Sequence, residues 1–250
     1  MAALVQARRR ALVVYITAGH PTPAATVELM RTVEDAGADV IEVGVPFSDP
    51  MADGPVIQAS SQAALENGTT YARTLELIGQ ARVNAPVVLF SYLNPILAAG
   101  PDALERAANA GTHGVLITDL PVGADPERER WLGESRLAFV RLVAPTTPVD
   151  RMREIATHGS GFVYLISRLG VTGAQDELAS DLPDVVARLR SATAMPVCVG
   201  FGISTPAHAR AIGRLADGIV VGSAVVRAAA DGMPAVHRLV RSLREALDDA

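Results

Sequence analysis

Short apolar runs rich in valine and isoleucine alternate with alanine- and leucine-rich stretches along this sequence. Unbroken apolar runs are typical of parallel strands that are buried on both faces, because such strands need no polar alternation. The stretches between them have the composition and length of helices. Strands are expected at residues 12–17, 40–45, 87–92, 114–118, 138–143, 161–166, 196–199 and 218–221.

The expected helices lie between these runs, at about residues 24–36, 57–67, 71–82, 101–110, 125–133, 149–158, 181–192 and 206–214, with further helices after the last strand. Eight strand–helix units without a linker or a break in composition predict an α/β fold, a single (β/α)8 or TIM barrel, with a short N-terminal helix. A length of 250 residues is normal for such a barrel. We therefore expect one TIM-barrel domain over residues 1–250.

Composition and charge exclude several other classes of protein. Hydrophobic residues make up 49% of the chain and the net charge is −5, which argues against disorder and against nucleic acid as the main partner. No apolar stretch approaches the length of a membrane span, and the first ten residues lack the pattern of a signal peptide. Together with the single cysteine, Cys198, this predicts a cytoplasmic protein.

The sequence contains no lysine. A Schiff-base aldolase and a covalent pyridoxal enzyme both require a lysine amine, so both are excluded for this chain acting alone. The five histidines are scattered without metal-ligand spacing. We therefore expect no metal and no cofactor.

Residues 38–58 carry the clearest candidate for chemistry. Glu42 interrupts an apolar strand, and the proline-rich loop after it holds Asp49 and Asp53. A stiff loop can bring a second carboxylate over the strand end, which is an arrangement for acid–base catalysis. Alternatively, Glu42 pairs with an arginine and the aspartates cap turns. Asp49, in Ser-Asp-Pro, is the better turn residue and Asp53 the better second acid, although spacing alone leaves this open.

Other side chains follow the expected strands at their carboxyl ends, where the active sites of such barrels lie. Aromatic residues there form either an apolar wall for a flat ligand or the top layer of the barrel core. These further candidates are Tyr15, Phe90, Tyr92, Asp119, Tyr164 and Phe201.

Glycine-rich turns follow the last three strands, at residues 167–173, 200–204 and 222–224. Backbone N–H groups at such turns can approach an anion, and Ser223 would add a hydroxyl at the start of a helix. This pattern predicts a phosphate site, with three ordinary turns as the alternative. Residues 169–178 form either a lid or a plain surface loop, and Arg168 faces either the anion or solvent.

Several motifs resemble one family over almost the whole chain. They are Tyr15-Ile-Thr-Ala-Gly, the segment 41–58, Ala144-Pro-Thr-Thr-Pro, the segment 167–173, Gly200-Phe-Gly-Ile-Ser and Gly222-Ser-Ala. They closely resemble the tryptophan synthase α subunit family. The resemblance implies a lyase that splits indole-3-glycerol phosphate into indole and glyceraldehyde 3-phosphate by a retro-aldol reaction, in tryptophan biosynthesis.

The resemblance also implies roles for individual residues. Glu42 matches the catalytic glutamate, which protonates indole C3 and takes the proton of the C3′ hydroxyl. Asp53 matches the catalytic aspartate, which accepts a hydrogen bond from the indole N–H. The protonated indole ring is then the electron sink, so neither lysine nor metal is needed. The remaining residues are expected to bind substrate. Those expected around the substrate are Tyr15, Tyr92, Tyr164, Thr172 and Phe201. Those expected to bind its phosphate are Gly173, Gly202, Gly222 and Ser223.

The family partner is a pyridoxal-phosphate β subunit in an α2β2 heterotetramer, which is expected to dock through residues 51–54 and around Asn94 and Pro95. Two positions depart from the family pattern, Thr118 and His20, and neither is a catalytic position. Three alternatives remain open at this point. The chain could be a stand-alone lyase that releases indole, a weakly catalytic subunit that activates a β partner, or another phosphate-binding barrel such as a sugar-phosphate epimerase.

Overall fold

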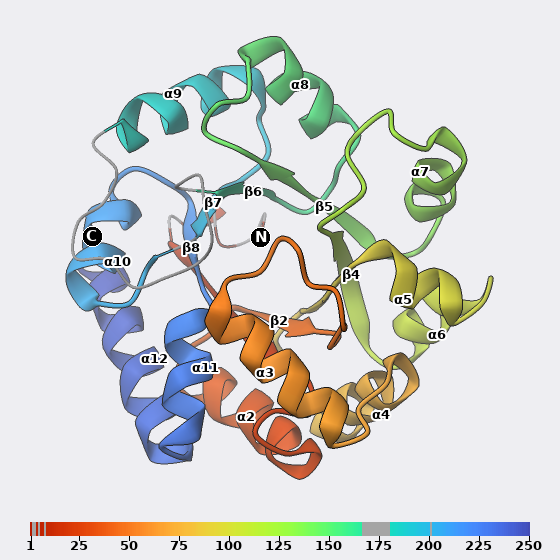
Figure 1. Ribbon diagram of the computed structural model, residues 1–250. Helices are drawn as coiled ribbons and strands as arrows, with labels where there is room; N and C mark the ends of the chain where they lie inside the picture. The colour runs from red at the N-terminus through yellow and green to blue at the C-terminus, as the bar shows by residue number, and fades with distance from the viewer. Residues whose placement is uncertain (2–3, 5, 8, 167–180, 201) are drawn as a thin grey trace.

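Eight parallel strands close into a barrel in which each strand pairs with the next along the chain and β1 pairs with β8 (Figure 1). The structure is a computed structural model that describes residues 1–250 except 2–3, 5, 8, 167–180 and 201. The strands are β1 (Ala11–Thr17), β2 (Val40–Gly44), β3 (Val87–Ser91), β4 (Thr112–Ile117), β5 (Ala138–Val143), β6 (Val163–Ile166), β7 (Val197–Gly200) and β8 (Gly218–Val221). The predicted TIM barrel is confirmed.

Helices surround the barrel and separate successive strands (Figure 1). They are α2 (Pro23–Asp35), α3 (Pro55–Glu66), α4 (Tyr71–Ala81), α5 (Leu93–Ala98), α6 (Ala103–Asn109), α7 (Pro126–Gly133), α8 (Val149–Thr157), α9 (Leu182–Ala192), α10 (Pro206–Gly213), α11 (Ser223–Ala230) and α12 (Met233–Asp248). The expected N-terminal helix falls on residues 1–10, several of which lie outside the described residues. Residues 169–178, expected to form either a lid or a plain surface loop, and Arg168 also lie outside them.

Helix α5 was not expected from the sequence. Pro95 reads as a helix breaker, yet it lies in the first turn of α5, where a proline removes no intrahelical hydrogen bond. The Leu93 N–H at the start of this helix donates to Asp119 Oδ1 at 2.8 Å. Asp119, a candidate at a strand end, therefore anchors the first turn of α5.

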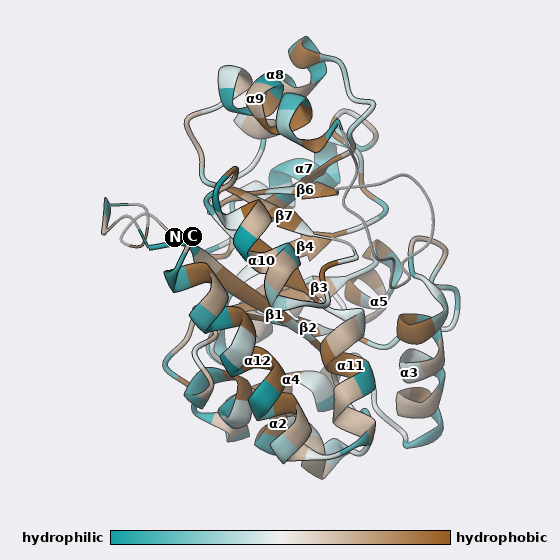
Figure 2. Cartoon of the chain, turned by 90° about the vertical axis from the view of Figure 1, so that its left-hand side faces the viewer, coloured by the Kyte–Doolittle hydropathy of each residue, from teal (hydrophilic) through white to brown (hydrophobic). Residues whose placement is uncertain are grey.

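Apolar side chains of the strands alternate between the barrel interior and the surrounding helices. The interior cluster includes Val13, Val88, Leu116 and Cys198, all buried. A larger cluster lies between the outer face of the sheet and the helices, whose apolar sides turn toward the barrel (Figure 2). This double burial accounts for the unbroken apolar runs of the strands.

A buried ion pair joins the end of the chain to the amino ends of the first strands. Arg244 of α12 donates to Asp39 Oδ2 and to the Arg10 carbonyl, each at 2.9 Å. The same carboxylate oxygen accepts the Leu12 N–H at 2.9 Å. These contacts pair the two buried charges at the end of the barrel opposite the loops that carry the candidate site.

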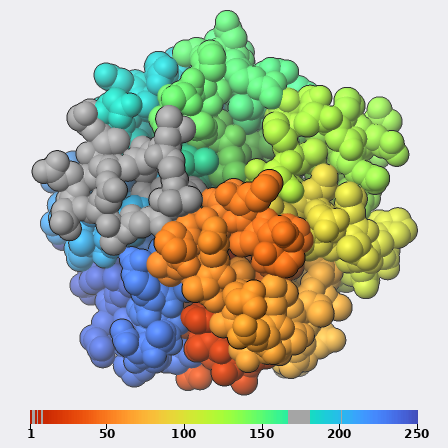
Figure 3. Space-filling model, in the orientation of Figure 1, coloured from red at the N-terminus to blue at the C-terminus, as the bar shows by residue number. Residues whose placement is uncertain are grey.

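The segment between β2 and α3 lies over the opposite end of the barrel, as the orange part of the space-filling view shows (Figure 3). This short segment covers the carboxyl end of β2. No helix in the described part of the chain is both long and apolar enough to cross a membrane.

Candidate active site

Glu42 points into the barrel from β2 and is buried, with 1% of its surface exposed. Neither carboxylate oxygen has a hydrogen-bond partner among the described residues, and no arginine of the described part pairs with it. Burial raises the pKa of Glu42 to about 8. An unpaired acid in the barrel core lowers the stability of the fold, so its presence indicates a catalytic role rather than a packing role.

Asp53 is held above β2 by the loop that leads into α3. The Tyr92 hydroxyl donates to Asp53 Oδ2 at 3.1 Å and accepts the Ala52 N–H at 2.8 Å. The Asp53 backbone is fixed as well, since its carbonyl accepts from the Gln58 side chain at 2.8 Å. Burial raises the pKa of Asp53 to about 6, and the hydrogen bond from Tyr92 opposes that rise.

Asp49 lies on the outside of the same loop. It is exposed, and its carboxylate accepts a hydrogen bond from Ser48 Oγ at 2.5 Å. Its carbonyl accepts the Met51 N–H at 2.9 Å, so Asp49 is a turn residue. Of the two loop acids, the structure places only Asp53 on the wall of the barrel cavity.

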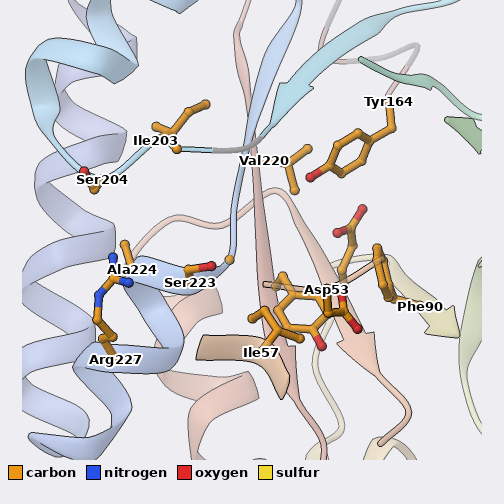
Figure 4. A pocket seen from close by; sticks show the side chains of 14 residues that line it. Asp53, Ile57, Phe90, Tyr164, Ile203, Ser204, Val220, Ser223, Ala224 and Arg227 are labelled. Carbon is orange, nitrogen blue, oxygen red and sulfur yellow. The ribbon is translucent and has the colours of Figure 1, made fainter. Parts of the chain in front are cut away.

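One cavity at the carboxyl ends of the strands is lined by both Glu42 and Asp53; Figure 4 shows Asp53 on its wall. It encloses about 600 Å³, including space open to solvent, which is the size of a small-molecule site. The described residues that line it are Tyr15, Glu42, Asp53, Ile57, Phe90, Tyr164, Gly202, Ile203, Ser204, Val220, Gly222, Ser223, Ala224 and Arg227.

Aromatic rings form the wall beside the two acids. Tyr15 and Phe90 meet edge to face, with ring centroids 5.2 Å apart and planes at 78°. The tyrosine hydroxyls fit because two strand glycines leave room. A Cβ on Gly44 would lie 2.1 Å from the Tyr15 hydroxyl, and a Cβ on Gly200 would lie 2.2 Å from that of Tyr164. Burial raises the pKa of both tyrosines, so both hydroxyls stay protonated.

The other end of the cavity is suited to an anion. Helix α11 begins at Ser223, and Gly222 before it supplies no side-chain cap, so the first N–H groups of the helix are available to a ligand. Gly202 has a φ of +80°, a backbone conformation that favours glycine, and it lies on the same cavity with Ser204.

The profile of the family described as "Tryptophan synthase alpha chain" matches residues 1–248. The chain belongs to the tryptophan synthase alpha chain family. This membership makes it an indole-3-glycerol-phosphate lyase of tryptophan biosynthesis.

Individual relatives in the family are similar over nearly the full length. A tryptophan synthase alpha chain of Desulfatibacillum aliphaticivorans is 46% identical over 99% of this chain and 96% of its own. A tryptophan synthase of Saccharomyces cerevisiae is 43% identical over 89% of this chain but only 32% of its own length. A structure of Mycobacterium tuberculosis tryptophan synthase superposes with a TM-score of 0.91 at 35% identity, covering 98% and 95% of the two chains. Solved structures of the family thus include tryptophan synthase complexes.

Four residues that were expected to bind substrate or phosphate are not among the described residues that line the cavity. Tyr92, expected at a strand end, donates its hydroxyl to Asp53, and its ring packs on Phe47 with centroids 5.2 Å apart, so its contact with substrate stays a prediction. Thr172, Gly173 and Phe201 lie outside the described residues. Thr118 and His20, the two departures from the family pattern, do not line this cavity. Thr118 Oγ1 donates to the Ser91 carbonyl at 3.5 Å. His20 is half-buried beside α2 and α11.

Sequence reasoning missed three residues of the cavity, Ile57, Val220 and Arg227. Two of them follow a predicted site residue by four positions, Ile57 after Asp53 and Arg227 after Ser223. Residues four apart in a helix lie on one face, and this applies to Ser223 and Arg227, which are both in α11, whereas Asp53 precedes α3. That spacing is the signal by which the sequence could have indicated Arg227.

Proposed function

We propose that the chain cleaves indole-3-glycerol phosphate with Glu42 as the proton-transferring acid and base and Asp53 as the carboxylate that stabilises charge on the indole ring. One observation carries the assignment. Two acids from β2 and its loop line one cavity, and burial raises the pKa of Glu42 to about 8 and of Asp53 to about 6. At pH 7 the first is therefore mostly protonated and the second mostly ionised, as the reaction requires.

The chemistry balances with these two groups alone. Glu42 gives its proton to indole C3, and the ring nitrogen becomes positively charged while its N–H donates to Asp53. The Glu42 carboxylate then takes the proton of the C3′ hydroxyl, a carbonyl forms at C3′, and the C3–C3′ bond breaks. The electrons of that bond restore the aromatic indole, so indole and glyceraldehyde 3-phosphate leave and Glu42 is protonated again.

The rest of the cavity supports the same substrate. We assign Tyr15 and Tyr164 to the indole side, because their rings line the wall next to Glu42. Gly202, Gly222 and Ser223 are assigned to the phosphate, which the N-terminus of α11 favours. Thr172, Gly173 and Phe201 keep the roles that the family resemblance implies, and no metal or organic cofactor enters the mechanism.

We further propose that the chain works in the cytoplasm as the α subunit of an α2β2 heterotetramer with a pyridoxal-phosphate β subunit. The yeast relative supports a partner, since the matched part is only a third of a protein named tryptophan synthase. A surface hollow next to the site, lined in part by Phe47, Asn94 and Pro95, lies beside the loop that carries Met51. Met51 is 83% exposed, and an exposed apolar side chain next to a hollow is typical of a docking surface.

Indole release from indole-3-glycerol phosphate tests the assignment. Glu42→Gln and Asp53→Asn should each abolish cleavage by the isolated chain, while Asp49→Asn, which neutralises an exposed acid of the same loop, should not. Near-normal turnover by Glu42→Gln would defeat the proposal. Repeating the assay with a β subunit separates the alternatives: high turnover without a partner favours a stand-alone lyase, and little turnover alone with strong activation of the partner favours a regulatory subunit.

A further inference from the structure

Arg227 is the only cationic side chain among the described residues that line the cavity. It lies one helical turn after Ser223 on α11, so both residues face the same side of the helix. Figure 4 shows its guanidinium group next to Ala224, on the side where Ser204 lies and far from Asp53. The positive charge therefore lies at the end of the cavity assigned to phosphate.

No carboxylate of the described residues forms an ion pair with the Arg227 guanidinium. Arg227 is exposed and has no ion pair or hydrogen bond with the described residues, whereas Arg190, Arg210 and Arg244 each pair with an aspartate. An arginine that the described residues leave unpaired can bind a ligand, and the planar guanidinium matches the oxygens of a phosphate group.

The cavity is thus electrostatically polar along its length. Figure 4 shows Asp53 at one end and Arg227 of α11 at the other, and Glu42 lines the same cavity from β2. A dianionic phosphate is repelled by an ionised Asp53 and attracted by Arg227 together with the helix terminus. The two ends therefore favour a single orientation of a substrate that carries an aromatic ring at one end and a phosphate at the other.

We propose that Arg227 binds the phosphate group of the substrate and makes the site selective for phosphorylated over unphosphorylated indole-glycerol. This inference rests on the proposed function and adds a side-chain cation to a phosphate site otherwise built from backbone N–H groups and the Ser223 hydroxyl. Because Arg227 is far from the two acids, it contributes to binding and orientation and leaves the proton transfers unchanged.

The test compares Arg227→Gln with Arg227→Lys, and with Arg238→Gln as a matched control. Arg238 is an exposed arginine on α12 without an ion pair among the described residues, so its replacement makes the same change in net charge away from the cavity. For Arg227→Gln we expect KM for indole-3-glycerol phosphate to rise roughly threefold to tenfold, because the variant loses one partly exposed ion pair with the phosphate dianion. The kcat should stay within about twofold, and cleavage of unphosphorylated indole-glycerol should not change.

Binding of glycerol 3-phosphate, measured by calorimetry, gives a readout that needs no turnover. Arg227→Gln should weaken this binding and flatten its dependence on salt, Arg227→Lys should keep most of it, and Arg238→Gln should bind like the unmodified chain. Equal effects on both substrates, a KM no different from that of Arg238→Gln, or no measurable binding of glycerol 3-phosphate by the unmodified chain would each overturn the inference. If glycerol 3-phosphate binds in an Arg227-dependent way but indole-3-glycerol phosphate is not cleaved, the proposed function fails and the anion site stands.

Discussion

Replacing Tyr92 with phenylalanine should raise the pH at which the enzyme becomes active. The Tyr92 hydroxyl donates to Asp53 Oδ2 at 3.1 Å and thereby opposes the effect of burial on the pKa of Asp53. A hydrogen bond to a charged group contributes about 1.5–3 kcal/mol, which corresponds to about one to two pH units. The acid side of the pH profile of kcat/KM, expected near 6 in the unmodified chain, should therefore move up by that amount.

At pH 7 this shift alone lowers the ionised fraction of Asp53 from about nine tenths to between one half and one tenth, so activity should fall roughly twofold to tenfold. At pH 9 the ionised fraction of Asp53 recovers. Activity is then limited by the loss of the proton from Glu42, whose pKa is raised to about 8 and which sets the alkaline side of the profile. The assay is indole release by the isolated chain between pH 5 and 10, and the acid and alkaline sides of the pH profile of kcat/KM are both fitted.

Tyr71→Phe is the matched control. Its hydroxyl is also buried and donates to the Ala103 carbonyl at 2.8 Å, but it lies outside the cavity. This control should lose stability without any shift of the pH profile. If Tyr92→Phe lowers activity equally at every pH, the hydroxyl orients the loop only and the reasoning about Asp53 is refuted.

Three other predictions follow from the same geometry. Glu42→Gln should be more stable than the unmodified chain at pH 9 and similarly stable at pH 4. The reason is that the raised pKa of Glu42 in the folded state costs the unmodified chain stability as the pH rises from about 4.5 through about 8. Thermal melts of both proteins against pH check this, and a difference in stability that is the same at every pH contradicts it. Gly200→Ala should raise KM at least severalfold, since the new Cβ would lie 2.2 Å from the Tyr164 hydroxyl, whereas Gly79→Ala, with ordinary 3.6 Å contact, should not. Met51→Asp should abolish activation by a β subunit and leave turnover of the isolated chain within about twofold; retained activation would exclude this loop as the docking surface.

The expected barrel was found because its signal is local. A strand buried on both faces must be apolar at every position, and this constraint marks each strand in the sequence whatever its neighbours are. The error at α5 has a local cause too, since a proline within a helix and a proline in its first turn look the same in sequence. The start of α3 at Pro55, two residues before the expected 57, follows the same rule.

The candidate site was only partly predictable. Glu42 and Asp53 were indicated by a carboxylate in an apolar strand and a stiff loop after it, and the structure places both on one cavity. The choice of Asp53 over Asp49 could not be made by spacing, because it depends on which side of the loop each acid faces. For Tyr92, the position at a strand end suggested contact with substrate, which stays a prediction, and only the structure showed that its hydroxyl donates to Asp53.

By itself the sequence determined the barrel, the family and the chemistry open to a chain without lysine, because these follow from residue types and their order along the chain. Only the tertiary structure decided which groups share one space: that Glu42 has no hydrogen-bond partner among the described residues, and that Arg227 lines the same cavity as both acids. Burial and proximity arise when eight strands bring distant segments to one end of a barrel. These are the quantities that set the pKa of an acid and the orientation of a substrate.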